Sequence, residues 1–152
     1  MTRIVVKASN EPDHDRLKEM LYKLGILKGR IPEKDLRIHG KEIDVVWTET
    51  RVKPPRTFNV FVIQFVGDLF ASFEKLTYAY REREHPQLVL VTSHKRKEEA
   101  VSLTETNIFC EIQNEVKIID VEEVEQWYKL ANSYYSFEAE KIGIKCGLHP
   151  YD

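Results

Sequence analysis

Two polar side chains stand inside runs of the sequence that are mostly apolar. Asp44 lies in the run 41–47, and Gln64 lies in the run 58–66. Burying a carboxylate or an amide without partners costs on the order of a few kcal/mol, so such residues are either paired or kept for chemistry. A carboxylate can hold a metal ion, and an amide can orient a water molecule. These two residues are therefore the first candidates for a functional site.

Both runs have the length and composition of strands, and strand geometry decides whether the two side chains can meet. Side chains alternate across a strand, so Gln64 shares a face with Val62, and Asp44 shares a face with Val46. If the two strands are paired neighbours, Asp44 and Gln64 meet at one end of the sheet.

The segment before these strands predicts an amphipathic helix. Apolar residues follow the i, i+3, i+4, i+7 spacing from Pro12 onward, at Leu17, Met20, Leu21 and Leu24. Asn10 is expected to cap this helix and Gly25 to end it. The preceding run Ile4–Lys7 fits either a short strand or an extended arm.

The rest of the chain alternates strand and helix patterns. Strands are predicted at 35–39 and 42–49, joined as a hairpin, and at 58–66, 87–92 and 116–119. Helices are predicted at 69–84, capped by Asp68, at 98–103 with a continuation over 108–112, and at 121–142, capped by Asp120. A strand, helix, strand crossover implies a parallel pair, so we expect one α/β domain with a mixed central sheet flanked by helices.

This order of elements, with Asp44 on the second strand and Gln64 on the third, resembles the PD-(D/E)XK, or restriction-endonuclease-like, nuclease superfamily. The resemblance covers about residues 12–93 and implies an αβββαβ core, to which 94–152 would add a C-terminal extension within a single domain, 1–152. In that superfamily an Asp and a Glu-X-Lys or Glu-X-Gln element surround Mg²⁺, which activates a water to attack a phosphodiester. By this resemblance Asp44 would hold the metal, Gln64 would orient the water, and Lys75 would contact phosphate.

The chain departs from that pattern at Val62, which stands where the glutamate is expected. Valine supplies no oxygen ligand, so Mg²⁺ binding should be severely weakened. A carboxylate could come instead from Asp68 or Glu74, and of these Asp68 is nearer to the strand. We therefore expect a nuclease-like, DNA-associated protein with weak or absent cleavage.

Charge is unevenly distributed along the chain. The net charge is −2, but residues 1–56 hold 13 Lys/Arg against 9 Asp/Glu, and the remaining residues are acidic. A basic patch can attract a polyanion, although ordinary solvated surface explains the same charges. The candidate nucleic-acid contacts are the cations of two predicted loops, Arg51, Lys53, Arg56, Lys95, Arg96 and Lys97.

Each site residue also has a simpler structural interpretation. Asp44 can accept backbone or lysine hydrogen bonds at a strand end, and Gln64 can be a satisfied core amide. Lys75 can lie along the apolar stripe of its helix with its ammonium in water. The remaining acid and histidine candidates are scattered without ligand spacing and are expected at the surface: Glu11, Asp13, His14, His39 and His94.

Composition predicts where the protein is located, and the last predicted helix supports a second function. Only two cysteines, no signal-like start and no long apolar run favour a cytoplasmic protein that is not in a membrane. An apolar seam over 121–142, made of Val121, Val124, Tyr128, Ala131, Tyr135 and Ile142, supports a second interpretation. The chain could be a non-catalytic assembly module that uses this helix to self-associate or to dock a partner.

Overall fold

The computed structural model describes residues 2–49 and 56–144, and side chains from residue 13 onward within these ranges. The main elements follow one another as α1 (Thr2–Leu27), β1 (Ile31–Ile38), β2 (Lys41–Glu49), β3 (Arg56–Ile63), α2 (Leu69–Glu82), β4 (Gln87–Thr92), α3 (Lys97–Thr104), β5 (Val116–Asp120) and α4 (Val121–Phe137). Short 3-10 turns precede and follow α3 at His94–Arg96 and Asn107–Phe109, and a π turn at Glu138–Ile142 prolongs α4.

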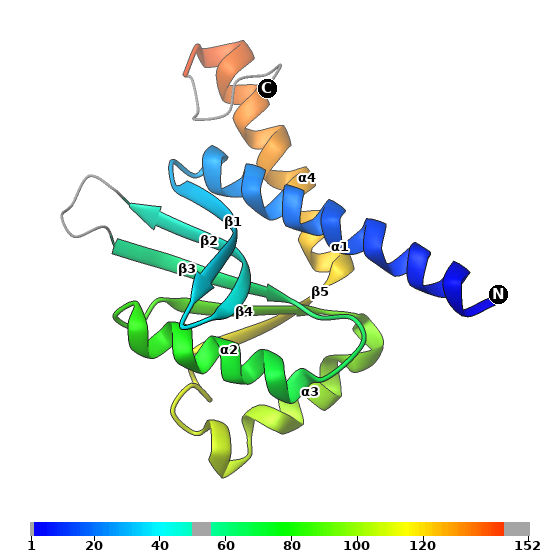
Figure 1. Cartoon of the computed structure of the whole chain (residues 1–152). Coiled ribbons are helices and arrows are strands. Elements are labelled where there is room, and N and C mark those ends of the chain that lie inside the picture. The colour runs from blue at the N-terminus through cyan, green and yellow to red at the C-terminus, as the bar shows by residue number, and fades with distance from the viewer. Residues whose placement is uncertain (1, 50–55, 145–152) are drawn as a thin grey trace.

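The five strands form one mixed sheet in the spatial order β1-β2-β3-β4-β5 (Figure 1). β1, β2 and β3 are antiparallel neighbours, whereas β3, β4 and β5 run parallel. Parallel neighbours need a crossover connection, which α2 and α3 provide. The predicted α/β class, with a mixed central sheet flanked by helices, is confirmed.

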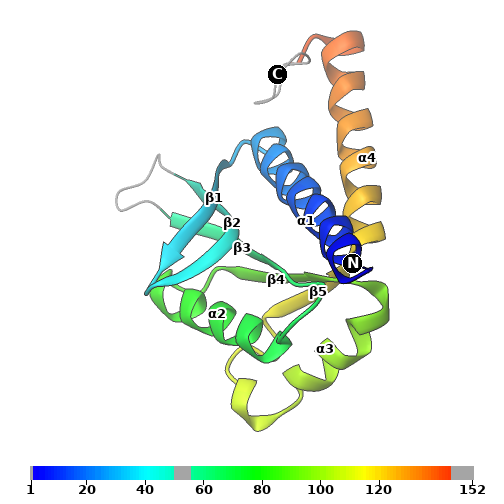
Figure 2. The same cartoon turned by 45° about the vertical axis from the view of Figure 1, so that its right-hand side comes forward.

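Helices cover both faces of the sheet. α1 and α4 lie on one face, and α2 and α3 lie on the other (Figure 2). The buried side chains divide accordingly into two clusters. One lies beneath α1 and α4 and includes Leu17, Leu21, Leu24, Trp47, Phe61 and Val124. The other lies beneath α2 and α3 and includes Val60, Val62, Phe73, Leu76, Leu90 and Ala100.

Both helix caps predicted from the sequence are present. The Asp68 carboxylate accepts the backbone N–H of Phe70 at 2.9 Å. Asp120 accepts the N–H of Glu123 at 2.9 Å, and the Glu123 carboxylate accepts the N–H of Asp120, which completes a capping box. These bonds satisfy backbone donors that a helix cannot satisfy itself.

The first helix differs from the prediction at both ends. Ile4–Lys7 is neither strand nor arm, because α1 is helical from Thr2 and passes through Pro12. The predicted caps at Asn10 and Gly25 are therefore wrong, although the side chain of Asn10 lies outside the described ones. α1 ends at Leu27, and Gly29 follows with a φ of +73°. Helix hydrogen bonds are local, so this segment needs no neighbouring strand to become helical.

Two later segments also differ from the prediction. β3 ends at Ile63 rather than at Val66, so Gln64 lies just outside the strand. Residues 108–112 do not prolong α3; they form a 3-10 turn and further turns that bury Phe109 and Ile112. In the described part of the chain, no helix is long and apolar enough to cross a membrane.

Candidate functional site

The hairpin of β1 and β2 is interrupted where two aspartates oppose each other. Lys34 pairs with Val45, and Leu36 pairs with Ile43, but Asp35 and Asp44 between them form no pair. Asp35 has a φ of +57°, a left-handed conformation that aspartate tolerates better than most residues. Like charges directly across a strand pair are destabilising, so this arrangement needs compensating cations.

The Asp44 side chain accepts a backbone hydrogen bond at the point where the pairing of β2 with β3 ends. The last paired residues of these strands are Val45 and Phe61. Beyond them, the Asp44 Oδ2 accepts the backbone N–H of Ile63 at 2.7 Å. The Asp44 side chain is 14% exposed, so it lies mostly beneath the surface. Its structural role as an acceptor at a strand end is thus directly visible.

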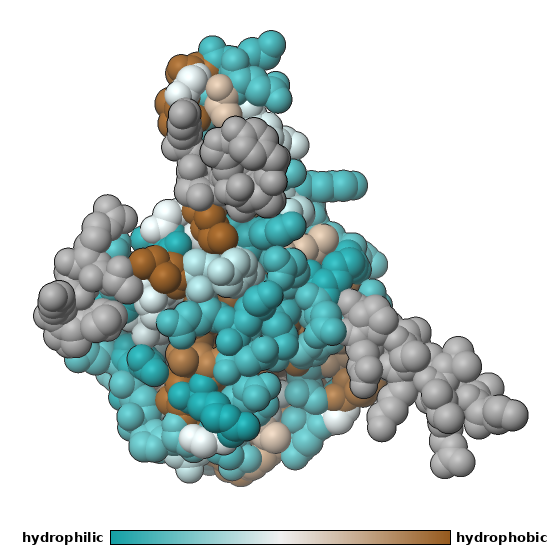
Figure 3. Space-filling model, turned by 45° about the horizontal axis from the view of Figure 1, so that its top comes forward, coloured by the Kyte–Doolittle hydropathy of each residue, from teal (hydrophilic) through white to brown (hydrophobic). Residues whose placement is uncertain are grey.

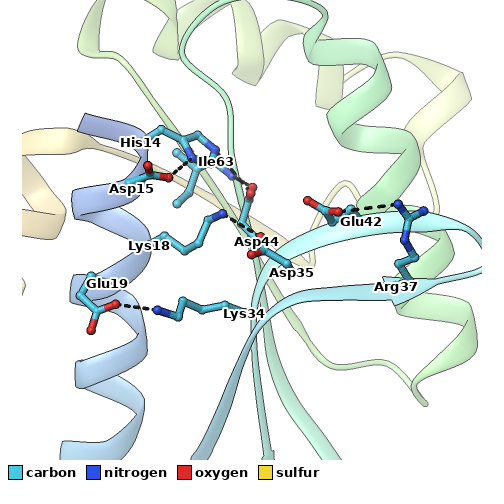
Figure 4. A network of polar contacts seen from close by, with 10 residues as sticks. All are labelled: His14, Asp15, Lys18, Glu19, Lys34, Asp35, Arg37, Glu42, Asp44 and Ile63. Carbon is cyan, nitrogen blue, oxygen red and sulfur yellow. Dashed lines mark hydrogen bonds and ion pairs between the residues drawn. The ribbon is translucent and has the colours of Figure 1, made fainter. Parts of the chain in front are cut away.

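Two basic residues of α1 complete the site, which we call the Asp44 cluster: His14, Lys18, Asp35 and Asp44 (Figure 4). His14 Nε2 lies 3.4 Å from Asp44 Oδ1. Lys18, one helical turn later, donates from Nζ to Asp35 Oδ1 at 2.7 Å. The Lys18 side chain is only 14% exposed. The two basic side chains therefore face the two opposed carboxylates.

The pKa values of the two basic side chains reflect this arrangement. The hydrogen bond with Asp44 raises the pKa of His14 above 6.5, against the opposing effect of burial. Burial disfavours the Lys18 ammonium, but the bond to Asp35 and the nearby charge of Asp44 outweigh it and raise the pKa of Lys18. Both shifts favour the charged form of the basic group, because each lies beside a carboxylate.

Gln64 does not join this cluster. Its Oε1 accepts a hydrogen bond from Ser72 Oγ of α2 at 3.1 Å, and its Nε2 donates to the carbonyl of Val66. Asp44 contacts α1 on one side of the sheet, whereas Gln64 contacts α2 on the other. The expected meeting of the Asp44 and Gln64 side chains is therefore not found, although Gln64 directly follows the residue that Asp44 binds.

The other expected metal and phosphate ligands are likewise apart. Asp68 is exposed and occupied as the cap of α2, Lys75 lies half-buried along α2, and Val62 is 1% exposed in the core. Within the described side chains, no group of three or more His, Cys, Asp or Glu residues could hold a metal ion.

The candidate nucleic-acid cations have different surroundings. Arg51 and Lys53 lie outside the described residues. Arg56 is exposed, with its guanidinium carbon 5.0 Å from the Phe58 ring centre. Arg96 donates to the carbonyl of Phe65 and to Glu99, and Lys97 donates to Glu123 at 2.5 Å. Lys95 is exposed and forms no ion pair with the described residues.

A crevice lies where β3 and β4 end. It has a volume of about 510 Å³, and we call it the Phe65 crevice after one of its lining residues: Phe65, Val66, Ser93, Lys95, Arg96 and Glu99. In open α/β sheets, ligands bind outside the carboxyl ends of parallel strands, and this crevice lies at that edge of the sheet. The Phe65 ring also lies edge-on to His14, with centroids 6.4 Å apart, so this crevice adjoins the Asp44 cluster.

The sequence did not indicate that three further residues lie beside Asp44, namely His14, Lys18 and Asp35. His14 was expected at the surface; its side chain is 30% exposed and contacts Asp44. His39 and His94 are exposed as predicted, although they pair with Glu82 and Asp120. The i, i+4 spacing of His14 and Lys18 was an available signal, because it places both on one helix face.

Compared with models of known protein families, with curated proteins and with solved structures, the chain matches none.

Proposed function

We propose that the chain is a nuclease-related protein that binds the backbone of nucleic acid, in the first place DNA, and does not cleave it. The order α1-β1-β2-β3-α2-β4 supports this proposal, because it is the order expected of a restriction-endonuclease-like core. The observation that carries the proposal is the position of Asp44. It lies on the second strand and reaches the end of the third, where the nuclease motif would have its acid.

The surroundings of Asp44 argue for binding without cleavage. One carboxylate oxygen is engaged by the N–H of Ile63, and the other faces the imidazole of His14. A Mg²⁺ ion would have to displace this imidazole, and it would gain no oxygen from Val62. The residues present thus do not fit a catalytic Mg²⁺ site, and we derive no metal-dependent step.

The Phe65 crevice offers contacts that suit a nucleic acid strand. The Lys95 ammonium is available for a phosphate, and the Ser93 hydroxyl lines the same wall. Phe65 and Val66 give an apolar surface on which a base can stack, and such stacking tolerates any base. The Arg96 guanidinium already donates hydrogen bonds to the carbonyl of Phe65 and to the Glu99 carboxylate. Its role is therefore to position the residues that line the crevice rather than to bind phosphate.

A cytoplasmic location, where nucleic acid is within reach, is part of this proposal and rests on the sequence alone.

The test is the affinity for a labelled oligonucleotide as a function of salt. Fluorescence anisotropy should give a log-log slope of clearly negative sign, because each neutralised phosphate contributes about −0.9 on duplex DNA. Lys95→Ala should make the slope less negative by about 1. Lys28→Ala is the matched control, because this exposed lysine directly follows α1, roughly 20 Å from His14 along the helix axis.

Three results would contradict the proposal. A slope near zero for single-stranded and duplex probes would mean that no phosphate is neutralised. Equal slopes for the wild type and Lys95→Ala would show that nucleic acid does not bind in the Phe65 crevice. Cleavage of the probe in Mg²⁺ that is lost in Asp44→Ala would show an active nuclease instead.

A further inference from the structure

The C-terminal part of α4 projects from the body of the protein. Both cartoon views show it extending past α1 and the sheet (Figures 1 and 2). Ten large hydrophobic residues are exposed in the described part of the chain, and five of them lie within 130–144: Leu130, Tyr134, Phe137, Ile142 and Ile144. Hydrophobic side chains are visible at this projecting end in Figure 3. Such a concentration marks an interaction surface.

The apolar seam expected from the sequence is a different face of this helix. Val124 is fully buried, and Val121, Tyr128 and Ala131 pack against the cluster beneath α1. The seam therefore belongs largely to the protein's own core. At 100° per residue, Leu130, Tyr134 and Phe137 lie within about 60° of one another, on a stripe roughly 110° from Val124. We call these three residues the α4 stripe.

We propose that the α4 stripe pairs with the same stripe of a second copy of this chain. The spacing i, i+4, i+7 is that of a helix-pairing seam. A contact between identical stripes is closed by a two-fold axis, so it makes a dimer and does not continue into a filament.

The area of the stripe is what a dimer core requires. The three side chains are 64%, 60% and 56% exposed. Each thus offers roughly 100–150 Å², given that a large side chain can bury about 150–250 Å². Two copies would bury about 800 Å² of apolar surface in this way. A standard interface buries about 1,600 Å² in total, of which somewhat more than half is apolar.

Sedimentation velocity of the full chain tests this inference. The wild type should form a dimer of the 17.9 kDa chain in the micromolar range. Tyr134→Lys should weaken the dimer by more than tenfold, because it places a charge in the apolar core of the interface. Val101→Lys is the control, since Val101 is an exposed apolar residue on α3. Circular dichroism should show the same helix content for all variants.

A wild type that remains a monomer at 100 μM, or a dimer unaffected by Tyr134→Lys, would overturn the inference altogether.

Discussion

The Asp44 carboxylate accepts the backbone N–H of Ile63 at 2.7 Å, where the pairing of β2 with β3 has just ended. A side chain thereby replaces a backbone partner at the point where the hairpin bends away from the sheet. Directly after Ile63, the last residue of β3, the Gln64 side chain lies on the α2 side, because successive side chains alternate between the two faces of a strand.

Removing this acceptor should destabilise the protein. Asp44→Ala leaves the Ile63 N–H without its partner, and an unsatisfied buried donor costs about 1–3 kcal/mol. Asp44→Asn keeps an oxygen acceptor and should cost less. Urea denaturation measures both free energies of unfolding. The exposed neighbour Glu42 gives the control, since Glu42→Ala should change stability by no more than about 0.5 kcal/mol. Equal costs for Asp44→Ala and Glu42→Ala would mean that the bond contributes nothing.

The Asp44 cluster should make stability depend on pH through His14. The pKa of His14 is raised in the folded state above 6.5, its ordinary value. The stabilisation by the imidazolium is therefore complete below pH 6.5 and is lost as pH rises through the folded pKa. Urea midpoints should fall across this window in the wild type and less steeply in His14→Gln. An NMR titration that gives His14 a pKa at or below 6.5 would contradict this prediction.

Divalent cations should not bind at Asp44. Calorimetric titration of Mg²⁺ or Mn²⁺ is expected to give no saturable heat with the wild type, because the His14 imidazole lies 3.4 Å from one carboxylate oxygen of Asp44 and Val62 supplies no ligand. Asp44→Ala should behave identically. A saturable heat that disappears in Asp44→Ala would establish a metal site at this position.

Gly25 should not tolerate alanine. In an exposed helix Gly→Ala is stabilising by up to about 1 kcal/mol, but here an added Cβ would lie 2.6 Å from Nε1 of the Trp47 indole. That indole is buried, and it donates to the carbonyl of Leu21 at 3.0 Å. Gly25→Ala should therefore cost about 1–3 kcal/mol, the usual range for overpacking. Thermal unfolding followed by tryptophan fluorescence measures the effect, and a raised midpoint would contradict it.

Much of the fold was determined by patterns that a sequence displays directly. The order of strands and helices from β1 to α4 follows from periods of 2 and 3.6 residues, which are properties of each segment alone. The caps Asp68 and Asp120 were predictable for the same reason, because a cap bonds to backbone groups two or three residues away.

The ends of elements and the composition of the candidate site were decided only by the tertiary structure. Gly25 was expected to end a helix, but it lies inside α1, where Trp47 from a distant strand packs against it. His14 and Asp44 are 30 residues apart in the sequence, and nothing local indicates their contact. Which face of α4 is buried likewise depends on the sheet beneath it. These outcomes depend on packing between segments, and a pattern within one segment carries no information about its neighbour in space.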